Sequence, residues 1–235
     1  MPEISYKELQ YLFDWNLSFR DKMKLQEFKR FIDLKNLRLF FLKRPLDPRG
    51  NLNHKEIEEA IEVGNFFPSY VLDFLKREES FDAKLKFFPY LFAKFFQEKR
   101  EGFNEKCFQM EQELRLVLTA LRAKKLDRDL LFELQYEDPT NFFIRDILSQ
   151  NSQEEYVPPA EYSRVKELYE NLVQDPKELY KAMLEFRVKR IEELVEDKPF
   201  TIDFLLGYFA HFLLVEDWNQ LDSAKGKAVL ESIVA

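Results

Sequence analysis

Histidine and cysteine side chains carry much of the proton-transfer, nucleophilic and metal chemistry of proteins, and this chain has few of them. His54 and His211 are its two histidines, and they lie too far apart in the chain to form a two-histidine metal motif on one helix. We expect His54 to be exposed in the first turn of a helix and His211 to be a hydrogen-bonded core residue. Cys107 is the only cysteine, so no internal disulfide can form and a reducing compartment is favoured. With no base beside it in the sequence, its thiol is expected to be buried and inert.

Carboxylates are abundant, but their spacing is not that of a catalytic motif. The adjacent pairs Glu58–Glu59, Glu154–Glu155 and Glu192–Glu193 would point in different directions on a helix, which is typical of solvated surface. A glycosidase pair assembled by folding stays open, whereas a dimetal bundle site is disfavoured because neither histidine stands in a Glu-x-x-His pattern. The two common glycine-rich phosphate motifs are absent. We therefore expect a protein that is not an enzyme, with no cofactor, no metal and no small-molecule substrate.

Composition predicts long helices joined by short turns. The chain has only 5 glycines against 25 phenylalanines, and 46% of its residues are hydrophobic. Its net charge is −7, with eleven basic and seven acidic residues in 1–50 but ten basic and seventeen acidic residues in 151–235. Such an acidic chain without a concentrated basic stretch is a poor nucleic-acid binder. The uneven charge could orient the protein in an assembly, or it could be scattered over solvated helix faces.

Apolar residues recur at helical spacing almost throughout, which predicts an all-α fold of antiparallel helical hairpins with about nine or ten helices. The longest helix is expected from Phe103 to Leu126, and a short last one from Ser223. Gly64 is expected to end a helix, and Arg44–Gly50 to form a loop. Helix starts are predicted at Ser5 with Glu8, Ser18, Asn53 with Glu56, Asp138–Pro139, Asp175–Pro176 and Thr201.

Two apolar features are explained by burial in the core. The aromatic residues between Pro68 and Phe96, which include Phe87, Phe88, Tyr90, Phe92, Phe95 and Phe96, are expected to pack in the core, because no polar groups accompany them as a flat cofactor would require. The run from Phe204 to Val215 is shorter than the ~20 residues needed to span a bilayer and predicts a buried helix. Because the chain also begins without a secretory signal pattern, a soluble cytoplasmic protein is expected.

One segment has the composition of a linker. Ser149 to Pro159 is polar, acidic and ends in two prolines, so a softer joint is expected there. It would separate an N-terminal helical bundle region, residues 1–150, from a C-terminal helical region, residues 151–235. The two regions could also pack as one continuous domain.

Three segments carry a resemblance to a known family. The first is Phe31-Ile-Asp-Leu-Lys-Asn-Leu-Arg38 with the following Pro45–Asn53, the second is Glu113–Leu126, and the third is Phe200–Gly207. Together they resemble an uncharacterised bacterial family encoded in V-type ATP synthase operons. That family is itself similar to the rotor-ring adaptor (named C, or d in eukaryotes) of V/A-type rotary ATPases. The matching segments extend over most of the chain.

The resemblance assigns roles to particular residues. In the rotor-ring adaptor family, helices with an acid-x-x-Asn-Leu-Arg pattern recur in a non-catalytic protein that couples the membrane rotor ring to the central stalk. The residues that match are Asp33, Asn36, Leu37 and Arg38 in the first helix, and Glu113, Leu114, Arg115 and Arg122 in the second, where Leu116 replaces the expected Asn. The arginines are expected either to pair with nearby helix carboxylates or to position bundles and contact a partner.

The resemblance implies a non-catalytic adaptor or assembly subunit of a V-type ATP synthase, active in proton or sodium transport. Its partners would be rotor-ring and central-stalk subunits. It would lie in the cytoplasm or peripherally on the cytoplasmic face of the inner membrane, reaching the membrane only through those partners. The alternative is a helical interaction scaffold unrelated to the ATPase, for which a concave surface with exposed Phe or Tyr would be the signature.

Overall fold

The computed structural model describes residues 4–77 and 80–221, and in this part of the chain the fold is all-α, as predicted. Twelve α-helices and one 3₁₀ helix are present there, and ten of the α-helices have seven residues or more. The short helices α5 and α8 account for the difference from the expected nine or ten. The helix expected from Ser223 lies outside the described residues. The bounds are α1 (Tyr6–Asn16), α2 (Phe19–Phe41), α3 (His54–Val63), α4 (Ser69–Leu75), α5 (Phe81–Lys86), α6 (Phe88–Gln97), α7 (Gly102–Lys125), α8 (Leu130–Glu133), α9 (Phe142–Ser149), η1 (Ala160–Tyr162), α10 (Ser163–Leu172), α11 (Pro176–Val195) and α12 (Ile202–Asn219).

Side-chain caps fix most of the predicted helix starts. In each case an oxygen accepts a hydrogen bond from an otherwise unpaired backbone N–H of the first turn. Gly64 ends α3 in the left-handed conformation, with φ 75°, which glycine adopts without steric cost. The N-caps that confirm the prediction are Ser5 and Asn53 in full capping boxes, and Ser18, Asp175 and Thr201.

One predicted helix start is wrong. Asp138 does not cap a helix at Pro139, because its carboxylate accepts instead from the backbone N–H and hydroxyl of Thr140, at 2.9 and 2.7 Å. That local turn delays the helix by three residues. Helix α9 begins at Phe142, capped by Asn141. Short polar side chains such as Asp compete in this way between capping and turn formation.

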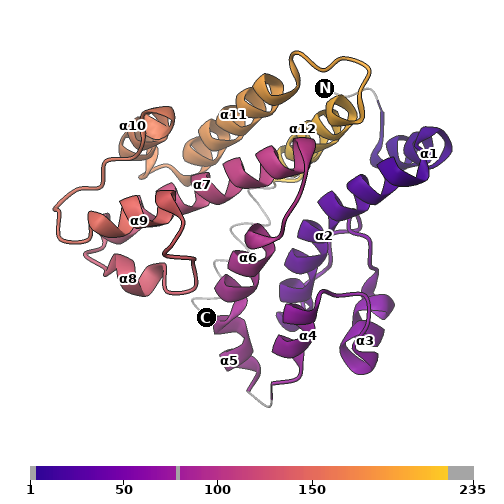
Figure 1. Ribbon diagram of the computed structural model, residues 1–235, viewed down its shortest axis with the longest axis horizontal. Coiled ribbons are helices and arrows are strands. Elements are labelled where there is room, and N and C mark those ends of the chain that lie inside the picture. The colour runs from indigo at the N-terminus through magenta and orange to yellow at the C-terminus, as the bar shows by residue number, and fades with distance from the viewer. Residues whose placement is uncertain (1–3, 78–79, 222–235) are drawn as a thin grey trace.

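Helix α7 joins two hydrophobic cores. The first core contains α1, α2, α3, α4, α6 and α12, together with the N-terminal half of α7. The second contains α8, α9, η1 and α10 with the C-terminal half of α7. Helix α11 also belongs to both, with Met183 in the second core and Ile191 and Val195 in the first. Figure 1 shows α7 crossing the molecule between α1–α4 on one side and α8–α10 on the other.

The aromatic segment 87–96 packs in the first core, as predicted. Phe88 and Phe95 are almost fully buried. Phe95 lies between Phe31 and Phe108, with ring centroids 5.2 and 5.0 Å apart. Contacts at these separations stabilise beyond the area they bury. The rings therefore hold α2, α6 and α7 together.

The segment predicted as a linker is irregular but anchored. Tyr156 inserts into the second core with 1% of its surface exposed. The ammonium of Lys124, in the last turn of α7, donates to the carbonyls of Asn151 and Gln153, both at 2.7 Å. Residues on both sides of position 150 thus share the second core, and the division at 150 remains a prediction.

Candidate functional site

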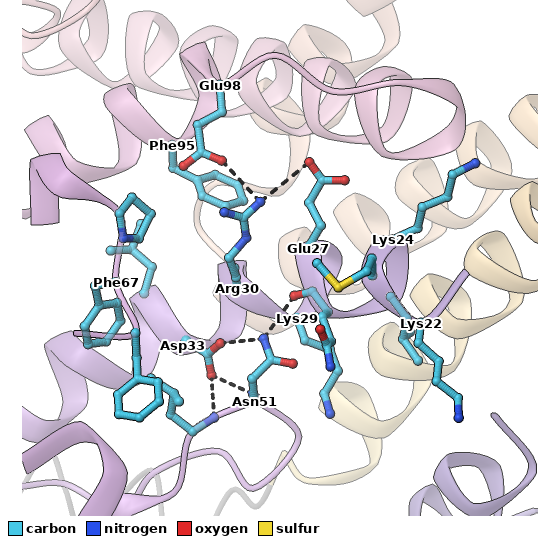
Figure 2. A pocket seen from close by; sticks show the side chains of 18 of the residues that line it. Lys22, Lys24, Glu27, Lys29, Arg30, Asp33, Asn51, Phe67, Phe95 and Glu98 are labelled. Carbon is cyan, nitrogen blue, oxygen red and sulfur yellow. Dashed lines mark hydrogen bonds and ion pairs between the residues drawn. The ribbon is translucent and has the colours of Figure 1, made fainter. Parts of the chain in front are cut away.

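Asp33 and Asn36, the first pair of predicted site residues, hold the loop between α2 and α3. The Asp33 carboxylate accepts from the backbone N–H groups of Asn51 and Leu52, at 2.7 and 3.0 Å, and from the Asn51 side chain at 2.7 Å (Figure 2). Asn36 is fully buried and exchanges two 2.8 Å hydrogen bonds with the backbone of Asp47. Both side chains are used internally, so in this structure they position the loop.

Gly50 allows this close approach between loop and helix. A Cβ at position 50 would lie 2.5 Å from Asp33 Oδ1 and 3.0 Å from Asn36 Nδ2. Burial raises the pKa of Asp33, and the hydrogen bonds from Leu52 and Asn51 offset part of that rise. The Pro45–Asn53 segment that follows the first resemblance helix is therefore tied to that helix by specific polar contacts.

Arg49 ties the same loop to the far end of the chain. Its guanidinium binds Asp47 through two hydrogen bonds, at 2.6 and 2.8 Å, and also binds the carboxylate of Asp217 on α12. Only 7% of the residue is exposed. A bidentate, largely buried pair of this kind fixes orientation as well as distance. Sequence reasoning gave Arg49 no role, because Asp217 is remote in sequence.

Two of the predicted site residues on α7 also make contacts within the protein. Arg115 pairs with the buried Glu137 at 2.5 Å, and its guanidinium lies over Phe96 at 5.3 Å. Glu113 accepts from the hydroxyl of Tyr162 at 2.7 Å. These contacts fasten α7 to the segments before α9 and at η1. The carboxylate partner of Arg115 comes from a loop, and not from the neighbouring helix turns.

Arg38 and Arg122 differ from Arg115. Both are exposed, and among the described residues neither side chain makes a hydrogen bond or ion pair. The aligned positions Arg38 and Arg115 thus have different environments, although both lie in a Leu-Arg-Leu sequence. The structure leaves Arg38 and Arg122 available to a partner.

A groove of about 880 Å³ runs along α2 above this loop (Figure 2). Arg30 lies in it between the carboxylates of Glu27 and Glu98, each 3.6 Å away. Lys29 lines the same groove and is only 8% exposed, and burial lowers its pKa. Phe66 also lines the groove and is 59% exposed. The groove is therefore a charged, concave surface with an exposed aromatic residue on its wall.

Apolar residues are exposed both in this groove and at the junction of α1 and α2. Met23 lines the groove and is half exposed. Trp15 and Phe19, at the junction of the two helices, are 74% and 82% exposed. The rings of Tyr11 and Trp15 contact each other, with centroids 5.8 Å apart, and exposed aromatic residues of this kind are typical of binding surfaces. We call this surface the α1–α2 apolar patch, and its members are Tyr11, Leu12, Trp15, Phe19 and Met23.

Sequence reasoning missed this patch, although a signal was present. Helix α1 buries Leu9 and Phe13, which contact α12 and the first core. Tyr11 and Trp15, four residues apart, form a second stripe on α1 that is exposed. A helix with more apolar residues than one stripe can hold predicts either full burial or a partner surface. Only the fold shows that α1 lies at the edge.

The residues first considered for chemistry are dispersed. His54 is exposed, as expected, whereas His211 is only half-buried. Cys107 is buried as predicted, and burial raises the pKa of its thiol well above the usual value. The three adjacent Glu pairs are all exposed, also as predicted. Within the described ranges no group of three His, Cys, Asp or Glu side chains is placed to hold a metal ion.

Fold and surface together define an all-α protein whose distinctive exposed feature is apolar. No helix in the described part of the chain has the length and hydropathy of a membrane span. The chain belongs to the family described as "Protein of unknown function (DUF2764)", whose model matches residues 1–235.

Relatives in chlamydiae match nearly the whole chain. A protein of Chlamydia pneumoniae is 25% identical, with 99% of this chain and 91% of the relative covered. One from Chlamydia muridarum is 24% identical, and one from Chlamydia trachomatis 23%, each with 97% of this chain and 90% of the relative covered. All three are described as uncharacterized proteins. No solved structure matches.

Proposed function

We propose that this protein is a non-catalytic adaptor or assembly subunit of a V-type (V/A-type) ATP synthase, linking the rotor ring to the central stalk in proton or sodium transport. The α1–α2 apolar patch is the observation that carries the proposal. Trp15 and Phe19 expose most of their surface, and large aromatic residues of this kind dominate binding energy at protein interfaces. The resemblance of the Asp33–Arg38 and Glu113–Arg122 helices to the rotor-ring adaptor supplies the identity of the partner.

Internal stiffness supports a mechanical role. Asp33, Asn36 and Arg49 fix the loop after α2, and Arg115 fixes the segment before α9. Helices α7 and α11 each contribute buried residues to both cores, and such continuity suits the transmission of force. An adaptor needs this property and needs no ligand. The proposed location is the cytoplasmic face of the inner membrane, where the partner subunits would hold the protein.

The test is affinity isolation of the tagged protein from gently solubilised native membranes, with mass spectrometry of the retained proteins. Wild type should retain rotor or stalk subunits in reproducible ratio, and the Trp15→Ser/Phe19→Ser variant should retain at least about tenfold less, because interface aromatics contribute about 2 kcal/mol or more each. The matched control is Phe132→Ser/Phe142→Ser, which removes two rings that are 68% and 74% exposed on α8 and α9. It should retain the subunits normally.

Two results would contradict the proposal: no ATPase subunit retained by wild type, or equal loss in the control variant.

A specific observation also favours a second candidate, the interaction scaffold. The groove along α2 is concave and carries exposed Phe66 and Met23, as a peptide-binding surface would. Wild type that retains a defined partner through the patch, but no ATPase subunit, would favour the scaffold.

A further inference from the structure

A second cavity, open to solvent, lies where α2, α7, α11 and α12 meet. It has a volume of about 340 Å³, within the range of small-molecule sites. One part of its lining is apolar, with Phe28, Phe108, Leu184 and Leu213 among the residues. The rest is charged. An apolar cavity with a few polar groups is the usual form of a ligand site.

Most of the charged lining residues already have partners. Arg49 is bound to Asp47 and Asp217. Arg187 donates through Nε to both carboxylate oxygens of Glu111, at 2.8 and 3.1 Å. These side chains are therefore structural parts of the cavity wall, and a ligand would have to compete with ion pairs to engage them.

Lys35 is different from the other lining cations. Its ammonium makes no hydrogen bond or ion pair with any described residue, and it lies over the ring of Phe31, 4.3 Å from the centroid. The side chain is exposed to solvent along part of its length. Desolvation by the cavity wall lowers its pKa, and Glu111 and Asp217 oppose that change. A charged group in this position gains from an anion placed beside it.

We propose that this cavity binds a small molecule with an apolar body and a single carboxylate, and that Lys35 holds the carboxylate. The apolar body would lie against Phe28, Phe108 and Leu213, where it loses its contact with water. The ammonium supplies a charge-assisted hydrogen bond that a neutral molecule of the same shape cannot use to the same extent. This site is separate from the α1–α2 apolar patch and goes beyond the adaptor function.

The fold provides a fluorescent reporter for this site. Tyr180 lines the cavity and stacks on Trp218, with ring centroids 6.4 Å apart and planes 12° from parallel. Trp15 and Trp218 are the two tryptophans of the chain, so Trp15→Phe leaves Trp218 as the single tryptophan, which can be excited selectively over the tyrosines. We would titrate this variant with decanoate, 1-decanol and acetate. Lys35→Met in the same background removes the charge and keeps the apolar stem, and Lys125→Met, at the exposed end of α7, is the control.

Decanoate should give a saturable change in Trp218 fluorescence. Its affinity should fall about tenfold in Lys35→Met, as expected for the loss of a hydrogen bond to a charged group, and stay unchanged in Lys125→Met. Decanol should bind more weakly than decanoate and be indifferent to Lys35→Met, and acetate should not bind. The proposal is overturned if decanoate gives no saturable change, if Lys35→Met binds it as tightly as the parent, or if decanol matches decanoate. Calorimetric titration of the same variants would check that the fluorescence change reports binding.

Discussion

At the scale of single residues, the most constrained contact is between Gly50 and Asp33. The loop backbone approaches α2 so closely that two loop N–H groups reach one carboxylate. A side chain at position 50 would occupy the space of Asp33 Oδ1. The same closeness makes both residues necessary, because the carboxylate satisfies the N–H groups that the approach buries.

Gly50→Ala should destabilise the fold by about 1–3 kcal/mol, the usual range for inserting a methyl group into a filled site. In an Asp33→Ala background the same substitution should cost less, because the atom nearest to the new Cβ has been removed. Urea unfolding of the two single variants and the double variant measures this coupling. If the changes in unfolding free energy of the two single variants simply add in the double variant, the loop moves away from α2 and the contact is not constraining.

At the scale of helices, α7 begins without a cap of its own. Its N-cap residue, Glu101, makes no side-chain hydrogen bond to the first turn. The backbone N–H of Phe103 donates instead to Asp203 of α12, at 3.2 Å, and Lys198 pairs with the same carboxylate at 2.8 Å. Partial burial alone would raise the pKa of Asp203, but the hydrogen bonds from Lys198 and Phe103 outweigh it and lower the pKa.

Asp203→Asn should therefore cost about 1–2 kcal/mol at pH 7. A carboxylate whose folded pKa is depressed stabilises the fold above its unfolded pKa of about 3.9, and this contribution is lost as pH falls through the folded value. Unfolding measured from pH 7 to pH 2 should show the wild type and the variant converging in acid. Asp197→Asn, an exposed neighbour, is the control and should change little. If the difference in unfolding free energy between wild type and variant does not change with pH, the charge of Asp203 does not stabilise α7.

At the scale of the whole molecule, the two cores share α7, the longest helix, and α11. Residues Phe103–Met110 of α7 belong to the first core and Leu114–Ala123 to the second. One helix cannot unfold in its middle without exposing apolar residues of both cores. The molecule should therefore unfold as one cooperative unit, although the sequence indicated a joint near position 150.

Leu114→Ala tests this cooperativity. Leu114 is fully buried in the second core, so the substitution should cost about 2–5 kcal/mol. Both tryptophans lie on helices of the first core, Trp15 on α1 and Trp218 on α12. The unfolding midpoints from tryptophan fluorescence and from far-ultraviolet circular dichroism should nevertheless fall together in Leu114→Ala. Neither midpoint should change in Leu131→Ala, a control at an exposed position. A fluorescence midpoint that stays in place would mean that the cores unfold independently.

Local features were predictable because neighbouring residues determine them. The capping boxes at Ser5 and Asn53 and the left-handed stop at Gly64 depend on groups within four positions, and the structure confirms them. Helical periodicity likewise determined the fold class. The prediction failed at Asp138, where two local hydrogen-bonding patterns compete and sequence does not rank them.

The sequence by itself therefore determined the all-α class, most of the predicted helix starts and the buried aromatic segment. Tertiary structure alone decided which partners Asp33 and Arg115 have. Arg49 binds Asp217, which is 168 positions away in the sequence, and the backbone of Phe103 binds Asp203, which is 100 positions away. The exposure of Trp15, and the lack of a hydrogen-bond or ion-pair partner for the Lys35 ammonium among the described residues, were also decided at that level. The physical reason is that hydrogen bonding within a helix depends on nearby residues, whereas burial and ion pairing depend on which surfaces the completed fold brings together.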